Sequence, residues 1–343
     1  MSRRSLFRSV SLALIAVFAA GAGVGTVSSA QALSTPRFAF PTPTRIQGAD
    51  RYDQAIKVSS SLRSADIVYL ASGEKFADAL SSSAVAAQRG SPLLLTPQDS
   101  VPETVLAELS RLHPSTIVIV GGTASVSEAA MEQVSQRVAD ATVVRVAGAD
   151  RYEVSRNLVT DPTVGAIDAD TVFAVTGANF PDALTASPAA VTRGNATVLL
   201  VNGTEEAATD ADIAAIDALG AHDIFLVGGT NSLSSGLETS LRLRRYGVTR
   251  SDGADRYEAG VNINRAIFGG TTTTVFLASG TSFPDALSGG PRAAKGSSPL
   301  YVVQHDCVPT SVLGEIERLQ AQQIIILGGP ATLGPGVDAL TPC

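Results

Sequence analysis

Short apolar segments alternate with segments of mixed polarity along most of the chain, and the stretch from 142 to 227 shows this most clearly. Its apolar segments are rich in Val, Leu, Ile and Thr and lie at 142–146, 171–176, 197–201 and 224–227. Segments of helical composition separate them, at 151–159, 181–192 and 210–219. Short continuous apolar segments are typical of strands buried on both faces of a parallel sheet. The alternation therefore predicts a three-layer α/β domain, with helices on both faces of a mostly parallel sheet.

The same order of motifs occurs three times along the chain. Gly-Ala-Asp-Arg-Tyr begins at 48, 148 and 253, and Phe-x-Asp-Ala-Leu begins at 76, 180 and 283. A leucine- or valine-rich segment follows each time, and then an apolar segment that ends in Gly-Gly. This order predicts three homologous domains, at 45–144, 145–249 and 250–343. Only 14 residues follow Gly329 in the third domain, so we expect its last helix to be short.

The first 44 residues differ from the repeats in composition. Three arginines precede an apolar run that is too short for a bilayer span, and Ala30-Gln31-Ala32 offers small residues to a peptidase. This pattern predicts an export signal at 1–32, with an uncleaved anchor as the alternative. Residues 33–44 hold three prolines and are expected to form a stiff spacer. The mature chain is then expected to be secreted and to lack a membrane span.

Charge and cysteine content narrow the possible functions. The formal net charge is −7, and removal of 1–32, which holds three arginines and no acid, changes it to −10. This charge disfavours a nucleic-acid partner, which requires a basic face. The absence of Trp disfavours a lectin with broad aromatic platforms. Cys307 and Cys343 are the only cysteines, and an extracellular location predicts a disulfide between them.

The repeated motifs resemble those of the cell wall-binding repeat 2 family of bacterial surface proteins. The resemblance covers about 45–343 and rests on Arg-x-x-Gly-Ala-Asp-Arg-Tyr, Ser/Thr-Gly-x-x-Phe-x-Asp-Ala-Leu and the Gly-Gly segment, in that order. It implies three Toprim-like or Rossmann-like α/β modules with pseudo-threefold symmetry. It also implies noncovalent attachment to anionic polymers of the cell wall. A family strand of Ile-Leu-Leu type corresponds to 93–95 and 198–200, but 300–302 reads Leu-Tyr-Val, so the resemblance does not imply an equal contribution of the three modules.

Two sets of arginines recur and are candidates for contact with a polyanion. The first set stands where a strand is predicted to end, which is where ligands of open α/β sheets bind: Arg45, Arg145 and Arg250. A solvated strand-end arginine is the alternative for this set. The second set lies inside the Gly-Ala-Asp-Arg-Tyr motif: Arg51, Arg151 and Arg256. We expect the second set to pair with the aspartates of Phe-x-Asp-Ala-Leu, with a phosphate-bearing ligand as the alternative.

Aspartates and tyrosines of the motifs have structural and functional interpretations. One group of aspartates precedes a predicted helix and has an acid three positions later, as in helix capping: Asp50, Asp150 and Asp255. The other group lies in the first turn of a predicted helix and is also expected to cap it: Asp78, Asp182 and Asp285. The motif tyrosines either stack on a sugar ring or pack half-buried against their own domain: Tyr52, Tyr152 and Tyr257.

The sequence offers no recognisable catalytic motif. Its three histidines, His113, His222 and His305, do not have the spacing of a metal site, and no Gly-x-Ser-x-Gly occurs. We therefore expect a noncatalytic cell-surface protein without metal or cofactor. Its expected partners are an anionic wall polymer (teichoic-acid-like or a secondary polysaccharide) and the peptidoglycan layer. The alternatives are a peptidoglycan hydrolase such as an amidase, a modulator of one, and a scaffold or adhesin that binds a protein.

Overall fold

The computed structural model describes residues 38–343, and these residues form one compact unit. The export signal expected at 1–32 and the first part of the spacer expected at 33–44 lie outside the described residues. The remaining spacer residues, 38–43, run without helix or strand into the first strand. Within 38–343, no helix combines the length and the apolar character that crossing a membrane requires.

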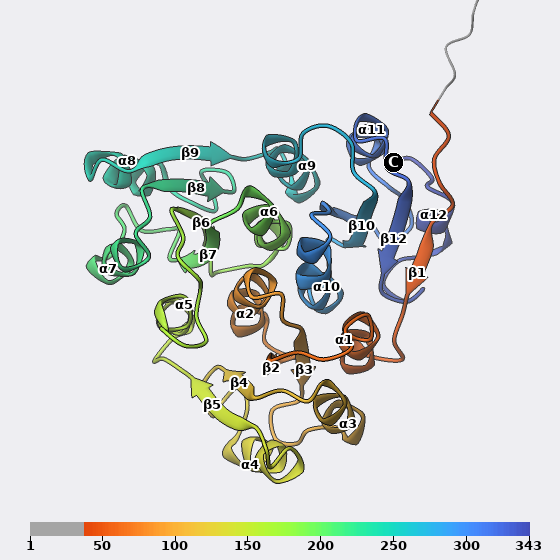
Figure 1. Ribbon diagram of the computed structural model, residues 1–343. Coiled ribbons are helices and arrows are strands. Elements are labelled where there is room, and N and C mark those ends of the chain that lie inside the picture. The colour runs from red at the N-terminus through yellow and green to blue at the C-terminus, as the bar shows by residue number, and fades with distance from the viewer. Residues whose placement is uncertain (1–37) are drawn as a thin grey trace, which may run out of the picture. The chain divides into compact units, whose positions relative to one another are not determined.

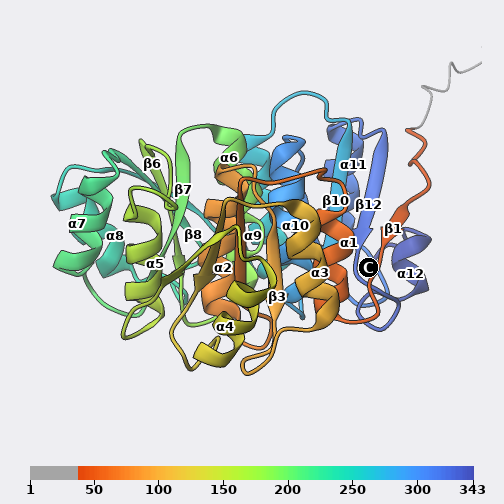
Figure 2. The same cartoon turned by 60° about the horizontal axis from the view of Figure 1, so that its bottom comes forward.

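Three parallel sheets of four strands each organise this unit (Figures 1 and 2). The first sheet has the order β3-β2-β4-β5 and comprises β2 (Ile67–Ser72), β3 (Leu93–Thr96), β4 (Thr116–Val120) and β5 (Thr142–Val146). The second has the order β7-β6-β8-β9 and comprises β6 (Thr171–Thr176), β7 (Ala196–Val201), β8 (Asp223–Val227) and β9 (Gly247–Ser251). The third has the order β11-β10-β12-β1 and comprises β10 (Thr274–Ser279), β11 (Leu300–Val303), β12 (Gln323–Leu327) and β1 (Thr44–Ile46). The predicted α/β fold of three modules is confirmed.

Helices separate the strands and cover the sheets. The α-helices of the described residues are α1 (Arg51–Ser59), α2 (Phe76–Gln88), α3 (Glu103–Leu112), α4 (Glu128–Arg137), α5 (Arg151–Thr160), α6 (Ala186–Arg193), α7 (Asp210–Ala218), α8 (Ser235–Leu243), α9 (Arg256–Ile267), α10 (Pro284–Lys295), α11 (Thr310–Arg318) and α12 (Pro335–Asp338). A 3-10 helix, η1 (Pro181–Ala183), precedes α6, so the single helix predicted at 181–192 is divided. Pro188 lies in α6, and Pro291 has the equivalent position inside the continuous helix α10, so this proline alone does not divide the helix.

Aspartate caps fix where the first helix of each repeat begins. Asp50 accepts hydrogen bonds from the backbone N–H groups of Tyr52 and Asp53, and the Asp53 carboxylate accepts one from Ala49. Asp150 and Asp255 make the equivalent bonds at the starts of α5 and α9. The Gly-Ala-Asp-Arg-Tyr motif therefore turns the chain from a strand directly into a capped helix.

The first strand of each repeat belongs to the sheet of the repeat before it. Strand β5 spans the expected boundary at 145 and pairs along its whole length with β4 of the first repeat, with Arg145 opposite Ile119. In the same way β9 pairs with β8. The N-terminal strand β1 pairs with β12 of the third repeat, with Arg45 opposite Ile326 (Figure 2). The three modules therefore form a closed ring, in which each sequence repeat is shared between two sheets.

The ring surrounds a central group of helices. Helices α2, α6 and α10 contact one another in all three pairs and lie at the centre of Figure 1. At one end of them Phe76, Phe180 and Phe283 form a triangle, with ring centroids 5.6, 5.7 and 6.1 Å apart and planes inclined by 61° to 62°. These equal angles mark the pseudo-threefold axis of the molecule.

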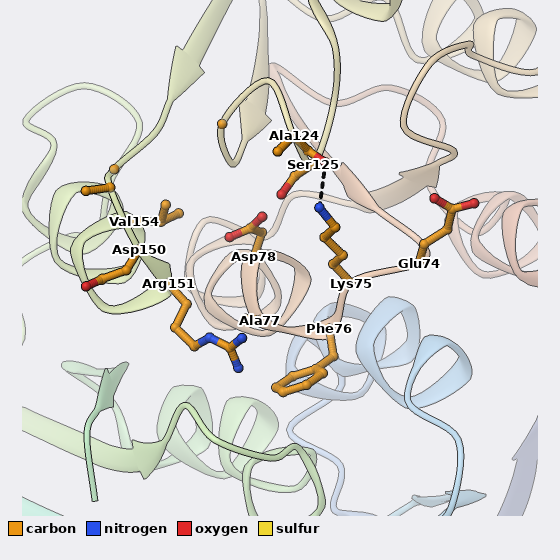
Figure 3. Close-up of a pocket in the computed structure, with 13 residues that line it drawn as sticks. Glu74, Lys75, Phe76, Ala77, Asp78, Ala124, Ser125, Asp150, Arg151 and Val154 are labelled. Carbon is orange, nitrogen blue, oxygen red and sulfur yellow. Dashed lines mark hydrogen bonds between the residues drawn. The ribbon is translucent and has the colours of Figure 1, made fainter.

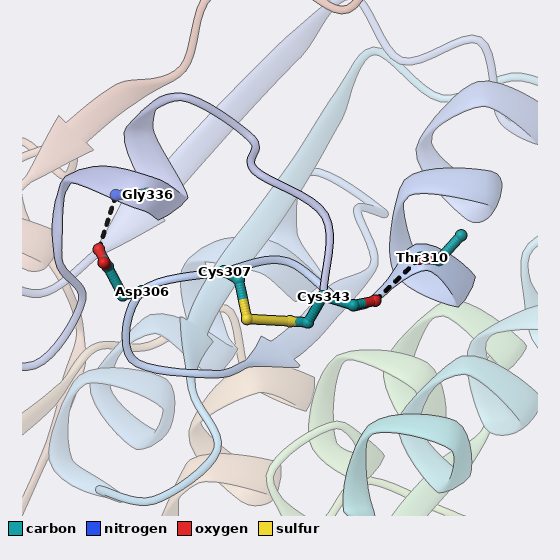
Figure 4. Close-up of a disulfide and its surroundings, with 5 residues drawn as sticks. All are labelled: Asp306, Cys307, Thr310, Gly336 and Cys343. Atoms are coloured by element: carbon teal, nitrogen blue, oxygen red, sulfur yellow. Dashed lines mark hydrogen bonds between the residues drawn. A yellow bond between two sulfur atoms is a disulfide. The ribbon is translucent and has the colours of Figure 1, made fainter.

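The third module ends with a covalent link. Cys307 and Cys343 form a disulfide (Figure 4), and the Thr310 hydroxyl donates a hydrogen bond to the Cys343 carbonyl at 3.0 Å. Helix α12 has four residues, whereas α4 has ten and α8 has nine. Gly336 in α12 donates its N–H to Asp306, which precedes the disulfide in the chain. The disulfide and this bond hold a terminal segment that has little helix to stabilise it.

Candidate functional site

The Gly-Ala-Asp-Arg-Tyr motif contacts the Ser/Thr-Gly motif of its own repeat. Arg51 donates from Nη1 to the Gly73 carbonyl at 2.5 Å. Arg151 and Arg256 donate to the Gly177 and Gly280 carbonyls at 2.6 Å. A Cβ atom at Gly73 would lie 2.7 Å from Cε1 of the Tyr52 ring, so only glycine leaves space for this packing. The two motifs therefore recur together because they form one junction between α1, α5 or α9 and the following strand.

The motif tyrosines lie at these same junctions. Tyr52, Tyr152 and Tyr257 are all half-buried, and the equivalent glycines 177 and 280 also leave space for a tyrosine ring. Burial raises the pKa of all three hydroxyls. None of the three lines either of the two clefts described below. Their geometry favours the packing role over the stacking role that was considered with it.

The aspartates of Phe-x-Asp-Ala-Leu face the Gly-Gly loops. Asp285 accepts a hydrogen bond from Thr332 at 3.2 Å, and Asp182 accepts one from Ser232 at 3.0 Å. Ser125 has the equivalent position beside Asp78, and its hydroxyl lowers the pKa of that carboxyl. The hydrogen bonds of Asp182 and Asp285 therefore come from loop hydroxyls and not from the helix N–H groups expected to donate them. These carboxyls instead mark the junction between a central helix and a Gly-Gly loop.

The first glycine of each Gly-Gly pair makes room for this carboxyl. Gly121 has a φ of +109°, and a Cβ atom there would lie 2.3 Å from Oδ2 of Asp78. The backbone conformation and the close approach both exclude a side chain. Gly228 and Gly328 have φ values of +131° and +110° and the same acidic neighbour in their own repeats. The Gly-Gly pair therefore serves to accommodate a buried acid.

Burial dominates the electrostatics of these carboxyls. Asp78 and Asp285 are 7% and 6% exposed. Desolvation raises the pKa of Asp78 and of Asp182, and it raises the pKa of Asp285 to about 6. The hydroxyl partner and an arginine of the next repeat oppose this rise. Each carboxyl is therefore held in its protonated form to a higher pH than an exposed aspartate.

The second set of arginines does not pair directly with these aspartates. No ion pair joins the two sets in the described residues, and the arginine Nη1 atoms bond to glycine carbonyls instead. The arginine that lowers each pKa belongs to the following repeat in the ring: Arg151 acts on Asp78, Arg256 on Asp182 and Arg51 on Asp285. The ion pair expected between these arginines and aspartates is therefore not formed. Instead, the arginine of one repeat lies across the junction from the aspartate of the preceding repeat.

The strand-end arginines bond within the protein. Arg45 donates to the Gly328 carbonyl at 2.7 Å and pairs with Asp338 at 2.7 Å. Arg145 and Arg250 make the equivalent bonds to the first glycine of the preceding Gly-Gly pair and to Glu128 and Glu238. Their side chains are only 12% to 14% exposed. Their geometry favours fixing the Gly-Gly loops over the polymer contact expected of them.

Two clefts lie between neighbouring repeats. The first cleft lies between the first and second repeats, and the cleft between the third and first repeats is called the third cleft. The first cleft, of about 400 Å³, lies between Lys75 and Asp78 of the first repeat and Asp150 and Arg151 of the second (Figure 3). The third cleft, of about 200 Å³, lies between Asp285 of the third repeat and Arg51 of the first. Both are at the carboxyl ends of parallel strands, where α/β sheets bind their ligands. Each is built by two repeats, so neither exists in an isolated repeat.

Several residues at these sites were not predicted as functional. Lys75, Ser125 and Thr332 line the clefts, and Phe76 lies at the edge of the first cleft, where its ring is 5.4 Å from the Arg151 guanidinium. The phenylalanine recurs in all three copies of Phe-x-Asp-Ala-Leu, and this recurrence is the sequence signal for its position at the cleft. Lys75 stands at a position that differs among the repeats, so comparison of the repeats for differences would have found it.

Comparisons with known proteins agree with the repeat structure. The sequence model of the family described as Cell wall binding domain 2 (CWB2) matches residues 45–131, 145–238 and 250–338. The chain is 28% identical over 285 residues to N-acetylmuramoyl-L-alanine amidase LytC of Bacillus subtilis, a match of 83% of this chain and 55% of the amidase. It is 29% identical over 268 residues to the amidase enhancer of Bacillus subtilis, a match of 78% of this chain and 35% of the enhancer. The chain thus spans about half or less of these curated relatives.

Solved structures share the fold. Cwp6 from Clostridium difficile superimposes with a TM-score of 0.77 at 24% identity, over 88% of this chain and 48% of that one. Cwp8 from Clostridium difficile gives a TM-score of 0.74 at 24% identity, over 87% of this chain and 51% of that one. At this level of identity the likeness establishes the fold.

Proposed function

We propose a wall-binding role from one premise: this chain belongs to the cell wall binding domain 2 (CWB2) family. In this proposal it is a secreted, noncatalytic protein of the cell surface that attaches noncovalently to an anionic polymer of the wall. The polymer lies in the clefts between repeats. The observation that carries the proposal is the recurring junction, in which an arginine of one repeat faces the strand ends of the preceding one.

The arginines of the clefts have hydrogen-bonding capacity left for a ligand. A guanidinium carries five N–H donors, and among the described residues Arg151 uses one of its donors, on the Gly177 carbonyl. Arg51 likewise uses one, on Gly73. The strand-end arginines, in contrast, bond to both a carbonyl and a carboxylate. These differences support a shift of the predicted polymer contact from Arg45, Arg145 and Arg250 to the second set.

Local charge has to supply the attraction, because the chain as a whole is acidic. The nearest acids in the clefts are of limited effect on an incoming anion. Asp50 and Asp150 accept helix N–H groups, and the buried carboxyls have raised pKa values. Arg51 and Arg151 line the clefts and bond to a glycine carbonyl rather than to a carboxylate, so their remaining donors can bind an anionic group of the polymer.

Sedimentation with isolated walls tests the proposal. A variant with Arg51, Arg151 and Arg256 changed to Gln is compared with one in which the exposed Arg63, Arg137 and Arg245 are changed to Gln. Both lose three positive charges, so a difference reports on the clefts. We expect the cleft variant to lose retention on intact walls by at least about tenfold, and the control to stay close to the parent. Equal loss of retention in both variants would exclude the clefts as the polymer site. If the parent were retained equally well on intact walls and on walls stripped of secondary polymers, those polymers would be excluded as the ligand.

A peptidoglycan hydrolase or a modulator of one is the second candidate, because the relatives named above include an amidase and an amidase enhancer. Zymography on peptidoglycan separates the two candidates. A clearing band from the purified chain would show hydrolysis and contradict the noncatalytic proposal. Acceleration of a separate amidase by the chain would favour the modulator.

A further inference from the structure

The clefts differ at one position that determines their charge. The residue before the phenylalanine of Phe-x-Asp-Ala-Leu is Lys75 in the first repeat, Asn179 in the second and Ser282 in the third. The whole chain contains three lysines, and Lys75 lines the first cleft. The third cleft has the serine in its place and about half the volume. The first cleft is therefore distinguished by both charge and size.

Lys75 lies across the mouth of the first cleft from Arg151. Its Nζ atom donates to the Ala124 carbonyl of the Gly-Gly loop at 2.6 Å. Figure 3 shows the Asp78 carboxyl between the lysine ammonium and the Arg151 guanidinium, and both cations lower the pKa of that carboxyl. The ammonium has three N–H donors and uses one of them here. Two cations from two different repeats thus direct spare donors at one cavity.

Three acids line this cavity beside the two cations, namely Glu74, Asp78 and Asp150. Asp150 is bonded to the N–H groups of Tyr152 and Glu153. Figure 3 shows the Glu74 carboxylate on the side of Lys75 away from Asp78, and this carboxylate also raises the pKa of Tyr52. Asp78 is the acid between the cations, and its burial disfavours the charged form. Lys75 and Arg151 are therefore the groups of this cavity that can hold an anion, and burial makes Asp78 between them harder to ionise than an exposed aspartate.

The Lys75 ammonium and the Arg151 guanidinium face the cavity from different sides, and this arrangement favours one class of anion over another. A carboxylate has two coplanar oxygens and is best matched by the two parallel N–H groups of one guanidinium. A phosphate group has charged oxygens that point in different directions, so it can bond to an ammonium on one side and a guanidinium on the other. We propose that the first cleft binds a phosphodiester group between Lys75 and Arg151 and is the strongest polymer site of the chain. This inference rests on the proposed wall binding.

Exchange of residues between repeats tests the inference in the full chain. Lys75→Ser gives the first cleft the residue of the third, Ser282→Lys does the reverse, and Lys57→Ser removes an exposed lysine outside the clefts as a control of equal charge. The probe is a synthetic glycerol phosphate oligomer, which has phosphodiester links. An oligogalacturonate of equal charge number serves as the carboxylate probe. Calorimetry gives the Kd of each probe for the parent and for each variant.

We expect Lys75→Ser to raise the Kd of the glycerol phosphate oligomer by about tenfold, and Lys57→Ser to change it by less than about threefold. Addition of Ser282→Lys to Lys75→Ser should recover part of the loss. Equal weakening by the two lysine variants, or equal weakening of both probes by Lys75→Ser, would overturn the inference. A parent that sediments with walls but does not bind the glycerol phosphate oligomer would overturn it while leaving the proposed function intact.

Discussion

Asp285→Asn tests the most unusual group in the junctions, a buried carboxyl with a pKa of about 6. Desolvation is the largest cause of this rise, and the Thr332 hydroxyl and Arg51 oppose it. The native carboxyl keeps its proton up to about pH 6, whereas the unfolded chain releases it near the ordinary value of 3.8. Between these values the native state binds more protons than the unfolded state. The free energy of unfolding therefore falls as the pH rises through this window.

The size of the effect follows from the two pKa values. Their difference corresponds to about 3 kcal/mol, which the parent loses between about pH 4 and about pH 7. Asparagine has the same shape and does not titrate. The difference in unfolding free energy between Asp285→Asn and the parent should therefore move by about 3 kcal/mol over this range, in favour of the variant at the higher pH.

Urea unfolding followed by far-ultraviolet circular dichroism, at several pH values across the window, measures this difference. Asp252→Asn is the control, because Asp252 is exposed. A constant difference between Asp285→Asn and the parent at all pH values would refute the reasoning from burial. The test also bears on function. A carboxyl that costs stability at neutral pH and recurs in all three repeats is better explained by a role in the cleft than by a role in folding.

Three further changes probe parts of the structure that the clefts depend on. Cys307→Ser opens a loop of 36 residues and should lower the free energy of unfolding by about 4 kcal/mol in urea, by the loop-entropy relation. Gly121→Ala forces a Cβ atom against Asp78 at a positive φ and should cost at least about 2 kcal/mol in the same measurement. Glu315→Gln weakens bonds that this fully buried carboxylate accepts from two arginines and a buried tyrosine, and it should cost about 2–3 kcal/mol.

Neighbouring residues supply matched controls for two of these changes. A Cβ atom at Gly122 would meet nothing within 4 Å, so Gly122→Ala should leave stability nearly unchanged. Glu317 is exposed, so Glu317→Gln should also have little effect. Equal costs for test and control would show that the close approach at Gly121, or the burial of Glu315, is not the cause. For Cys307→Ser, the contradicting outcome is unfolding identical to that of the oxidised parent.

The sequence predicted the elements well because strands buried on both faces leave a clear pattern. The segments expected at 142–146 and 171–176 coincide with β5 and β6. The partner of each strand was not predictable in this way. The apolar pattern of β5 shows that it is buried, but it contains no information on whether it joins the sheet before it or after it. That choice depends on a pairing with β4, which lies outside the repeat that the motifs define.

The roles of charged residues were predictable only in part. The acid spacing after Asp50 identified a helix cap, since capping is local in sequence. The bonds of Arg45 to Gly328 and Asp338 join residues that are about 290 positions apart, so spacing gives no indication of them. For Asp78, position in the first turn suggested a cap, but the carboxyl turns to the Gly-Gly loop, where Gly121 makes the space for it. Such tertiary contacts decide which arginines remain available to a ligand.

Ring closure explains why three repeats yield a cleft at the last junction as well as at the first. Each cleft takes one wall from the Phe-x-Asp-Ala-Leu segment of one repeat and the other from the Gly-Ala-Asp-Arg-Tyr motif of the next. In an open row, the third repeat would have no following motif, and its Asp285 would face solvent. Pairing of β1 with β12 brings Arg51 to that position, and the bond from Arg45 to Asp338 fastens the contact. The third cleft therefore depends on a strand of three residues at the start of the first repeat. This dependence links the stability of the ring directly to the number of complete clefts.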